Sequence, residues 1–331
     1  MKAEAVAEFA QELRCDVLGV GPDEASYGQG LVSEISQLSG NKALNGVQAS
    51  PSQGISTSAA SHFLIGCCSP PPQMQSNSQV ASSGDDPAIT AFAAKAKENG
   101  EAAILITTAS KTSAERLAQL HPSLSLIIYQ SLGTATQSPE AVGKTWLVSP
   151  GDLGREALVV TYSNNGPVLL KPVPLGPDFA NAKKGTEVMD DYLHQVDQAQ
   201  LLKLWPRSKT IHYVGSKACL SCHRADFNRW HSSAHSHAYL DLLKQGHGLD
   251  PDCVKCHVTG LSSTCGFLSQ SKTPQLANVT CESCHGPGGA HILNPKWAKM
   301  NLGTKVCVTC HTQENSPNFN FASYWLKIKH H

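Results

Sequence analysis

Four times in its second half, the chain places two cysteines three positions apart and follows the second with a histidine. The motifs are Cys219-Leu-Ser-Cys222-His223, Cys253-Val-Lys-Cys256-His257, Cys281-Glu-Ser-Cys284-His285 and Cys307-Val-Thr-Cys310-His311. Two thiols at this spacing can add to the two vinyl groups of one porphyrin, and the adjacent histidine then reaches the iron as its proximal ligand. The pattern therefore predicts four covalently attached haem c groups.

Zinc is the rival interpretation, because paired Cys-x-x-Cys motifs also form zinc sites. Zinc does not require a histidine directly after the second cysteine, whereas all four motifs have one, so haem is favoured over zinc or a plain disulfide scaffold. Four cysteines lie outside the motifs: Cys15, Cys67, Cys68 and Cys265. In an oxidising compartment we expect them to form a disulfide or two, or to be buried thiols, with a redox-active Cys67–Cys68 pair as the less favoured alternative.

The function depends on the sixth ligand of each iron, since an iron with a second histidine passes electrons and one with an open face can transform a small molecule. Of 15 histidines, 11 remain after the four proximal ones. His235 follows the first motif in a segment that we expect to be helical, where it would share a face with His231. His291 follows a glycine-rich turn that lets the backbone approach a porphyrin. His330 lies near the C-terminus.

The other histidines are weaker candidates for a fourth distal ligand. His212, His237 and His247 lie close to the motifs, although each taken alone is more typical of a surface or hydrogen-bonded histidine. His62, His121 and His194 lie in the first half and are expected to be structural, and Met300 is more typical of packing than of an axial ligand.

Residues 213–331 resemble the cytochrome c554 family of tetrahaem proteins. The resemblance rests on Tyr213-Val-Gly-Ser before the first motif, Trp230 followed by His235-x-x-Ala238, Cys253-x-x-Cys256-His257-x-Thr-Gly260, Asn278-Val-Thr-Cys281-Glu-Ser-Cys284-His285-Gly-Pro-Gly, and the closing SerProAsnPheAsnPhe with TyrTrp-x-LysIle-x-His330. It implies distal ligation by His235, His291 and His330.

The same resemblance leaves the iron of the second motif open to three interpretations. A family member lacks a strong sixth ligand there, which would make His257 the only axial ligand. The spare histidines of this chain could supply one instead. Related tetrahaem cytochromes also form extracellular filaments, in which a neighbouring subunit can provide a distal histidine.

The two halves of the chain carry opposite net charges. Residues 206–331 hold 13 Lys+Arg and 6 Asp+Glu, a net of +7, and residues 1–205 hold the remaining 13 and 20, a net of −7. Four haems with their propionates would add about −4 to the basic half. The zero total charge excludes a nucleic-acid binder driven by overall basicity, and no apolar run is long enough for a membrane span.

The first half predicts an α/β domain at 1–205, because helical and strand patterns alternate. Helices are expected at 3–13, 24–38, 87–98, 112–120 and 185–204, and strands at 17–20, 102–107, 124–129, 145–149 and 156–163. An extended stretch is expected at 167–173. Residues 40–85 read as a loop-rich insertion with one apolar patch at 62–66. Residues 206–331 predict a mainly α, loop-rich multihaem domain.

The first half more weakly resembles a 5′-nucleotidase-type metallophosphatase, which would be an α/β layered sandwich. Three segments carry the resemblance: Cys15-Asp16-Val-Leu-Gly-Val-Gly-Pro-Asp-Glu…Tyr27-Gly28, Ala103-Ile-Leu-Ile-Thr-Thr108 and Ser125-Leu-Ile-Ile-Tyr-Gln130. Thr107-Thr108 stand where that family has Ser-His, Tyr129-Gln130 replace Gly-His, and the first motif lacks its Asn and His. Without these ligands a dinuclear metal site cannot form, so we expect a domain without phosphatase activity that serves as a scaffold or docking surface.

The leading functional prediction is electron transfer between redox partner proteins, or along a homo-oligomer or filament, through four mostly bis-histidine haems. The alternative is a haem enzyme with an open site at His257 that acts on a small nitrogen or oxygen species. Haem attachment of this type implies a periplasmic or extracellular protein, although the first residues show no apolar signal core.

Overall fold

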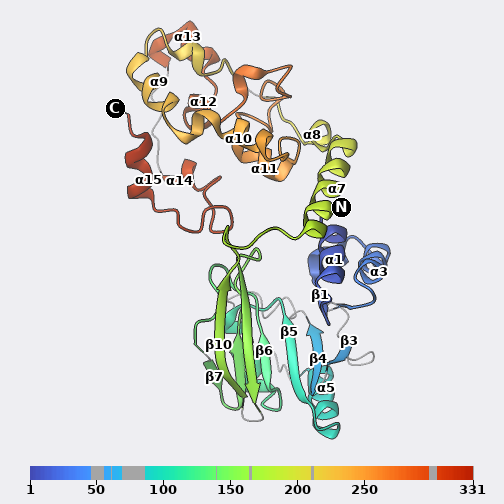
Figure 1. Cartoon of the computed structure of the whole chain (residues 1–331). Coiled ribbons are helices and arrows are strands. Elements are labelled where there is room, and N and C mark those ends of the chain that lie inside the picture. The colour runs from blue at the N-terminus through green and yellow to red at the C-terminus, as the bar shows by residue number, and fades with distance from the viewer. Residues whose placement is uncertain are drawn as a thin grey trace. The chain divides into compact units, whose positions relative to one another are not determined.

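The computed structural model describes residues 1–45, 56–60, 62–68, 86–138, 140–163, 166–209, 212–297 and 304–330. The chain forms two compact units, Met1–Met189 and Asp190–His331 (Figure 1). We refer to them as the first and second units. In the described residues no helix is both long and apolar enough to cross a membrane.

A six-stranded mixed sheet forms the centre of the first unit, with strand order β3-β4-β5-β6-β8-β7. The four inner strands run parallel, and the edge strands β3 and β7 are antiparallel to their neighbours. The strands are β3 (Ser56–Ala60), β4 (Phe63–Cys68), β5 (Ala102–Thr107), β6 (Leu126–Ile128), β7 (Glu140–Val142) and β8 (Thr145–Val148). This is the parallel arrangement that alternating strand and helix patterns predict.

Alternate side chains of this sheet pack into two different cores, as the two-residue repeat of a strand requires. Leu105, Ile127 and Leu147 face a core that they share with α5 (Pro87–Glu98) and α6 (Lys111–Leu120). The other face packs against a hairpin of β9 (Glu156–Ser163) and β10 (Gly166–Pro174), through residues such as Ile104 and Leu170. The unit is therefore layered as helices, sheet and hairpin.

A smaller subdomain precedes the sheet. It contains α1 (Lys2–Glu12), β1 (Leu18–Val20), α2 (Pro22–Ser26), α3 (Gln29–Leu38) and β2 (Ala43–Asn45), and β1 pairs with β2 in parallel. Ala7, Val20 and Ile35 form its core. The single helix expected at 24–38 is wrong, because Gly28 has a φ of +94°, a left-handed value that ends α2 before α3 begins.

The loop-rich interpretation of 40–85 is also wrong in part. Its apolar patch is β4, which lies inside the sheet and pairs with β3 and β5. The polar composition around β4 hid this strand, because β3 reads Ser-Thr-Ser-Ala-Ala and has no strand-like apolar run. Residues 46–55, 61 and 69–85, including the segment 50–54 and the three prolines 70–72, lie outside the described residues.

The second unit consists of short helices joined by loops. They are α8 (Leu201–Leu204), η1 (Ser216–Cys219), α9 (Arg224–His231), η2 (Ala234–His237), α10 (Ala238–Lys244), α11 (Pro251–His257), η3 (Pro274–Leu276), α12 (Cys281–His285), α13 (Gly289–Leu293), η4 (Pro295–Trp297), α14 (Thr304–Cys307) and α15 (Phe321–Ile328). Its apolar core is small and centres on Tyr239, Val254, Phe267 and Leu276. A unit with so few long elements needs other sources of order.

The second unit begins before the predicted boundary at Pro206. Helix α7 (Lys183–Ala199) crosses the division, and its residue Tyr192 donates a hydrogen bond of 2.9 Å to the buried carboxylate of Asp250. Leu202 packs into the core of the second unit. Gln200, with a φ of +52°, separates α7 from α8, so the helix expected at 185–204 is two helices.

The layered core predicts a specific stability result. Ile127 is fully buried on the central strand β6, so Ile127→Ala should lower the free energy of unfolding of the first unit by about 2–5 kcal/mol. Leu169→Ala, on an exposed position of β10, is the control and should change it by less than about 0.5 kcal/mol. Urea titration, monitored by hydrogen exchange of the β5 and β6 peptides, measures the free energy of unfolding of both variants. Equal effects would contradict the assignment of this core.

Candidate haem-binding sites

Each cysteine motif lies on a single turn of helix or directly beside one. The second and third motifs occupy α11 and α12, while Cys219 ends η1 and Cys307 ends α14. Side chains three apart on a helical turn share a face, so each motif presents both thiols on one side. Side-chain caps begin two of these turns: Asp250 accepts from the Asp252 N–H at 3.0 Å, and Thr280 accepts from the Glu282 N–H at 3.3 Å.

Three of the four motif histidines face a histidine from another part of the chain. The ring centroids are 6.1 Å apart for His223 and His291, 6.2 Å for His311 and His235, and 5.7 Å for His285 and His330. Two metal–nitrogen bonds of about 2 Å, extended to the ring centres, separate two imidazoles on one metal by roughly 6 Å. These ring pairs therefore have the separation that one iron between them requires.

Burial lowers the pKa of three of these rings. The pKa of His235 is lowered, mainly by burial and then by the nearby His311 and His257. Burial likewise lowers the pKa of His285 and of His311. A lowered pKa favours the neutral imidazole, which is the form that binds a metal.

His257 differs from the other motif histidines. Its Nδ1 lies 2.9 Å from the carbonyl oxygen of Ala238, so this nitrogen donates to the backbone and leaves Nε2 for a metal. In the described part of the chain, none of the histidine ring pairs includes His257.

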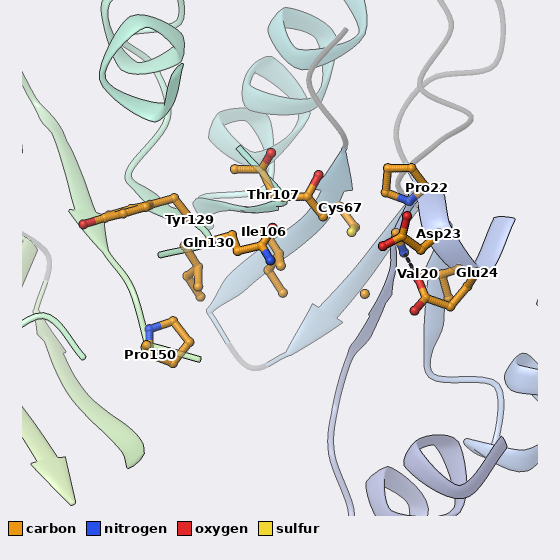
Figure 2. A pocket seen from close by; sticks show the side chains of 15 residues that line it. Val20, Pro22, Asp23, Glu24, Cys67, Ile106, Thr107, Tyr129, Gln130 and Pro150 are labelled. Atoms are coloured by element: carbon orange, nitrogen blue, oxygen red, sulfur yellow. Dashed lines mark hydrogen bonds between the residues drawn. The ribbon is translucent and has the colours of Figure 1, made fainter. Parts of the chain in front are cut away.

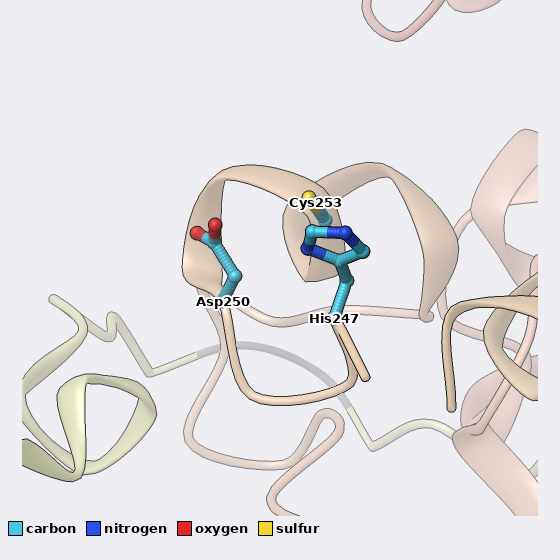
Figure 3. Close-up of side chains that lie close together, drawn as sticks. All are labelled: His247, Asp250 and Cys253. Carbon is cyan, nitrogen blue, oxygen red and sulfur yellow. The ribbon is translucent and has the colours of Figure 1, made fainter. Parts of the chain in front are cut away.

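The three weaker distal candidates occupy different surroundings. His212 is exposed, and its carbonyl accepts from the Gly289 N–H at 3.0 Å. His237 is exposed, with its Nε2 3.7 Å from the Asp241 carboxylate. His247 lies next to the second motif, where its ring, Asp250 and Cys253 have ligand atoms within 4.8 Å of one another (Figure 3). Of the three, only His247 is grouped with a motif cysteine in this way.

Thiols of different motifs contact each other. The Cys219 thiol hydrogen-bonds to Cys281, and the Cys256 thiol hydrogen-bonds to Cys310. These bonds raise the pKa of Cys219 and of Cys256 and lower the pKa of Cys281 and of Cys310 to about 6. The first motif therefore adjoins the third, and the second adjoins the fourth.

The third and fourth motifs are also neighbours. The pKa of Cys284 is raised to about 11, mainly by burial and then by the negative charges of Cys307 and Cys310. The spatial order of the motifs is thus first, third, fourth and second, which differs from their order in the sequence.

A buried glutamate joins the loops around these motifs. Glu282, in the third motif, is 4% exposed, and its carboxylate accepts from the N–H groups of Val214 at 3.0 Å, Gly215 at 2.7 Å and Gly288 at 2.7 Å. Gly215 has a φ of +81°, and a Cβ there would lie 2.7 Å from the Gln275 carbonyl oxygen, so only glycine fits. Glu282 thereby holds the loop before the first motif and the glycine-rich turn that leads to His291.

The sequence reasoning missed two features of this region. It placed His231 and His235 on one helix, but α9 ends at His231 and His235 lies in the separate turn η2. It also did not single out Glu282. Glu282 could have been found from the sequence as an acidic residue between the two cysteines of a motif, close to a glycine-rich turn. Met300 lies outside the described residues.

The first unit has a separate cavity of about 540 Å³ at the carboxyl ends of β1, β4, β5 and β6 (Figure 2). The positions that carry the metallophosphatase resemblance meet there: Asp23, Glu24, Thr107, Thr108, Tyr129 and Gln130. No histidine, lysine or arginine is among the described residues that line it. A group of three metal-ligating side chains was found in the described residues only at His247.

The cysteines outside the motifs are thiols rather than disulfides in this structure. Cys67 and Cys68 are both buried, and burial raises the pKa of Cys67 to about 11 and that of Cys68 to about 12. Consecutive residues of a strand point to opposite faces, and a protonated thiol is a poor nucleophile. These properties oppose a redox-active vicinal pair.

Comparison with known proteins gives matches for the segment that holds the first three motifs. Residues 218–286 match the model of the family described as cytochrome c554 and c-prime. Cytochrome c-554 of Nitrosomonas europaea is 41% identical over 91 residues, which cover 23% of this chain and 39% of the relative. The chain thus spans about two fifths of the length of this curated relative.

Two solved structures align with a larger part of the chain. Sulfate thiohydrolase SoxB of Thermus thermophilus has a TM-score of 0.45 and 17% identity, covering 59% of this chain and 39% of that one. A 5′-nucleotidase described as putative, from Staphylococcus aureus, has a TM-score of 0.40 and 12% identity, covering 73% and 52%.

The Glu282 contacts predict that a single substitution at this position destabilises the second unit. Glu282→Gln replaces one accepting oxygen by an amide that cannot accept, so the free energy of unfolding of the second unit should fall by about 2–3 kcal/mol. Glu314→Gln, at an exposed position, is the matched control and should have almost no effect. Urea denaturation midpoints measure both. A midpoint for Glu282→Gln equal to that of Glu314→Gln would contradict the role of Glu282.

Proposed function

We propose that this protein is a multihaem c-type cytochrome that carries electrons through four covalently bound haem c groups, most of them with two histidine ligands. The segment at 218–286 matches a family of c-type cytochromes, which supports covalent haem attachment and electron transfer. The number of haems and their ligands are inferred from the residues of this chain.

The eight motif cysteines would bind the four haem groups through thioether bonds. They are Cys219, Cys222, Cys253, Cys256, Cys281, Cys284, Cys307 and Cys310. The histidine that follows each pair would be the proximal ligand: His223, His257, His285 and His311. A bound haem supplies the one-electron Fe³⁺/Fe²⁺ couple, and the protein holds each ligand ring in place.

The single observation that carries the proposal is the set of three ring pairs. His291, His235 and His330 face the proximal histidines of the first, fourth and third motifs, at centroid separations of 5.7–6.2 Å. Each pair joins elements that are distant in sequence, so helical spacing alone does not explain it. Distal ligation by His235, His291 and His330 would leave three irons without an open position, as electron transfer favours.

The thiol contacts support an order for the electron path. Neighbouring motifs are first and third, third and fourth, and fourth and second. An electron would then pass along centres held by His223, His285, His311 and His257, in that order or in reverse. The centres of His223 and His257 would be the two ends.

The end at His257 supports an alternative function. Because none of the ring pairs of the described residues includes His257, this centre could be an open haem site that acts on a small nitrogen or oxygen species. His212, His237 or His247 could instead supply its sixth ligand. A histidine from a second copy of the chain could also do so, in a homo-oligomer or filament.

The remaining parts of the proposal concern place and partners. Covalent haem of this kind implies export, so we infer a periplasmic or extracellular protein that exchanges electrons with redox partner proteins. The first unit would act as a scaffold without phosphatase activity, because its cavity lacks histidine among the described lining residues.

Ligand substitutions test the bis-histidine pairs. The pyridine haemochrome assay of the purified protein should give four haems per chain. His291→Ala, His235→Ala and His330→Ala should each convert one haem in four from low-spin to high-spin ferric iron, measured by low-temperature EPR. His231→Ala is the control, since this exposed ring stacks on Phe227. Spectra unchanged by all three substitutions would refute these distal assignments.

Carbon monoxide tests the centre at His257. We expect the reduced protein to bind carbon monoxide at one haem in four, seen as a partial change of the Soret band. If the reduced spectrum is unchanged, the enzyme alternative is excluded. In that case alanine at His212, His237 or His247 should create a carbon monoxide site if that residue is the sixth ligand, and a second copy is the source if none does.

A further inference from the structure

A carboxylate lies beside the ring of the first motif histidine. Asp226 is in the first turn of α9, three residues after His223, and its Oδ2 is 3.5 Å from His223 Nδ1. The Asp226 side chain is only 14% exposed, so water screens its charge weakly. Asp226 also acts on a second motif histidine, since it opposes the lowering of the pKa of His285.

The other motif histidines have neutral partners where contacts are seen. His257 Nδ1 is 2.9 Å from the Ala238 carbonyl, and His311 Nδ1 is 3.1 Å from the Ser316 hydroxyl. Within the described residues, His223 is the motif histidine with a carboxylate at ion-pair distance. The four proximal rings therefore have unequal electrostatic surroundings.

We propose that Asp226 is a positioning and tuning residue that lowers the reduction potential of the centre held by His223, relative to the other three. This inference rests on the proposed function. A negative charge next to the proximal imidazole increases the basicity of the ring and stabilises Fe³⁺, which carries one positive charge more than Fe²⁺.

This inequality would set the direction of the first transfer. The centre held by His223 would be the low-potential end, so an electron donated there by a reduced redox partner protein would pass on to the centre of the third motif. In that transfer Fe²⁺ at the first centre would be oxidised to Fe³⁺ and Fe³⁺ at the third would be reduced to Fe²⁺.

The test is a redox titration of the whole haem-loaded protein, followed by EPR and optical spectra. Asp226→Asn should make one haem at least tenfold easier to reduce, a rise of at least about 59 mV for one electron. The shifted signal should be the one that His291→Ala removes from the low-spin set. The reduction potentials of the His311 and His257 centres should change by less than that of the His223 centre.

Two further variants separate charge from structure. Asp226→Glu keeps the negative charge and should retain most of the wild-type potential. Asp252→Asn also removes one carboxylate from the first turn of a motif helix, but Asp252 is half-exposed and lies 3.4 Å from Lys255, so its shift should be smaller.

Several outcomes would overturn the inference. They are no shift in Asp226→Asn, an equal shift of all four haems, or equal shifts in Asp226→Asn and Asp226→Glu. If Asp226→Asn does not incorporate haem, Asp226→Ser removes the same charge and takes its place in the titration. An unshifted potential of the His223 centre in that variant would also overturn the inference. The haem count and the low-spin signals of the unmodified protein test the proposed function separately, so the two can fail independently.

Discussion

The buried carboxylate of Glu282 is the contact on which the geometry of the second unit depends most. It binds the N–H groups of Val214, Gly215 and Gly288, and so joins segments that flank the first and third motifs. A buried carboxylate without such partners would cost several kcal/mol, which makes the two loops and the glutamate mutually dependent. Because the glycine-rich turn leads to His291, this contact also sets where that ring can lie.

The second unit has little apolar core for its length, and its order comes from crossings between short elements. The Trp230 indole donates to the Val279 carbonyl, and Arg229 donates to the Leu326 carbonyl at 2.8 Å, so α9 is tied both to the third motif and to α15. These crossings bring His291, His235 and His330 to rings far away in sequence. The cofactors that we propose would replace the missing apolar core.

Local patterns predicted the elements and the motifs, whereas contacts between distant residues could not be read from them. The strand Ala102–Thr107 and the helix Pro87–Glu98 follow from periodicity and capping, and the motif cysteines follow from spacing. Strand β4 was missed because the sequence that flanks it is polar. Its parallel partner β5 is separated from it by a long connection. The partners of Glu282 and Asp226 depend on backbone groups and ring positions that no periodicity encodes.

The pairing of rings across the chain has a consequence for biosynthesis. A chain that is exported from its N-terminus presents each cysteine motif before its facing histidine in two pairs, because His291 follows His223 and His330 follows His285. In the remaining pair His235 precedes His311. Under the proposed ligation and export, haem could be attached to the first and third motifs before their facing histidines are available. The His285–His330 pair could form only after His330 has emerged.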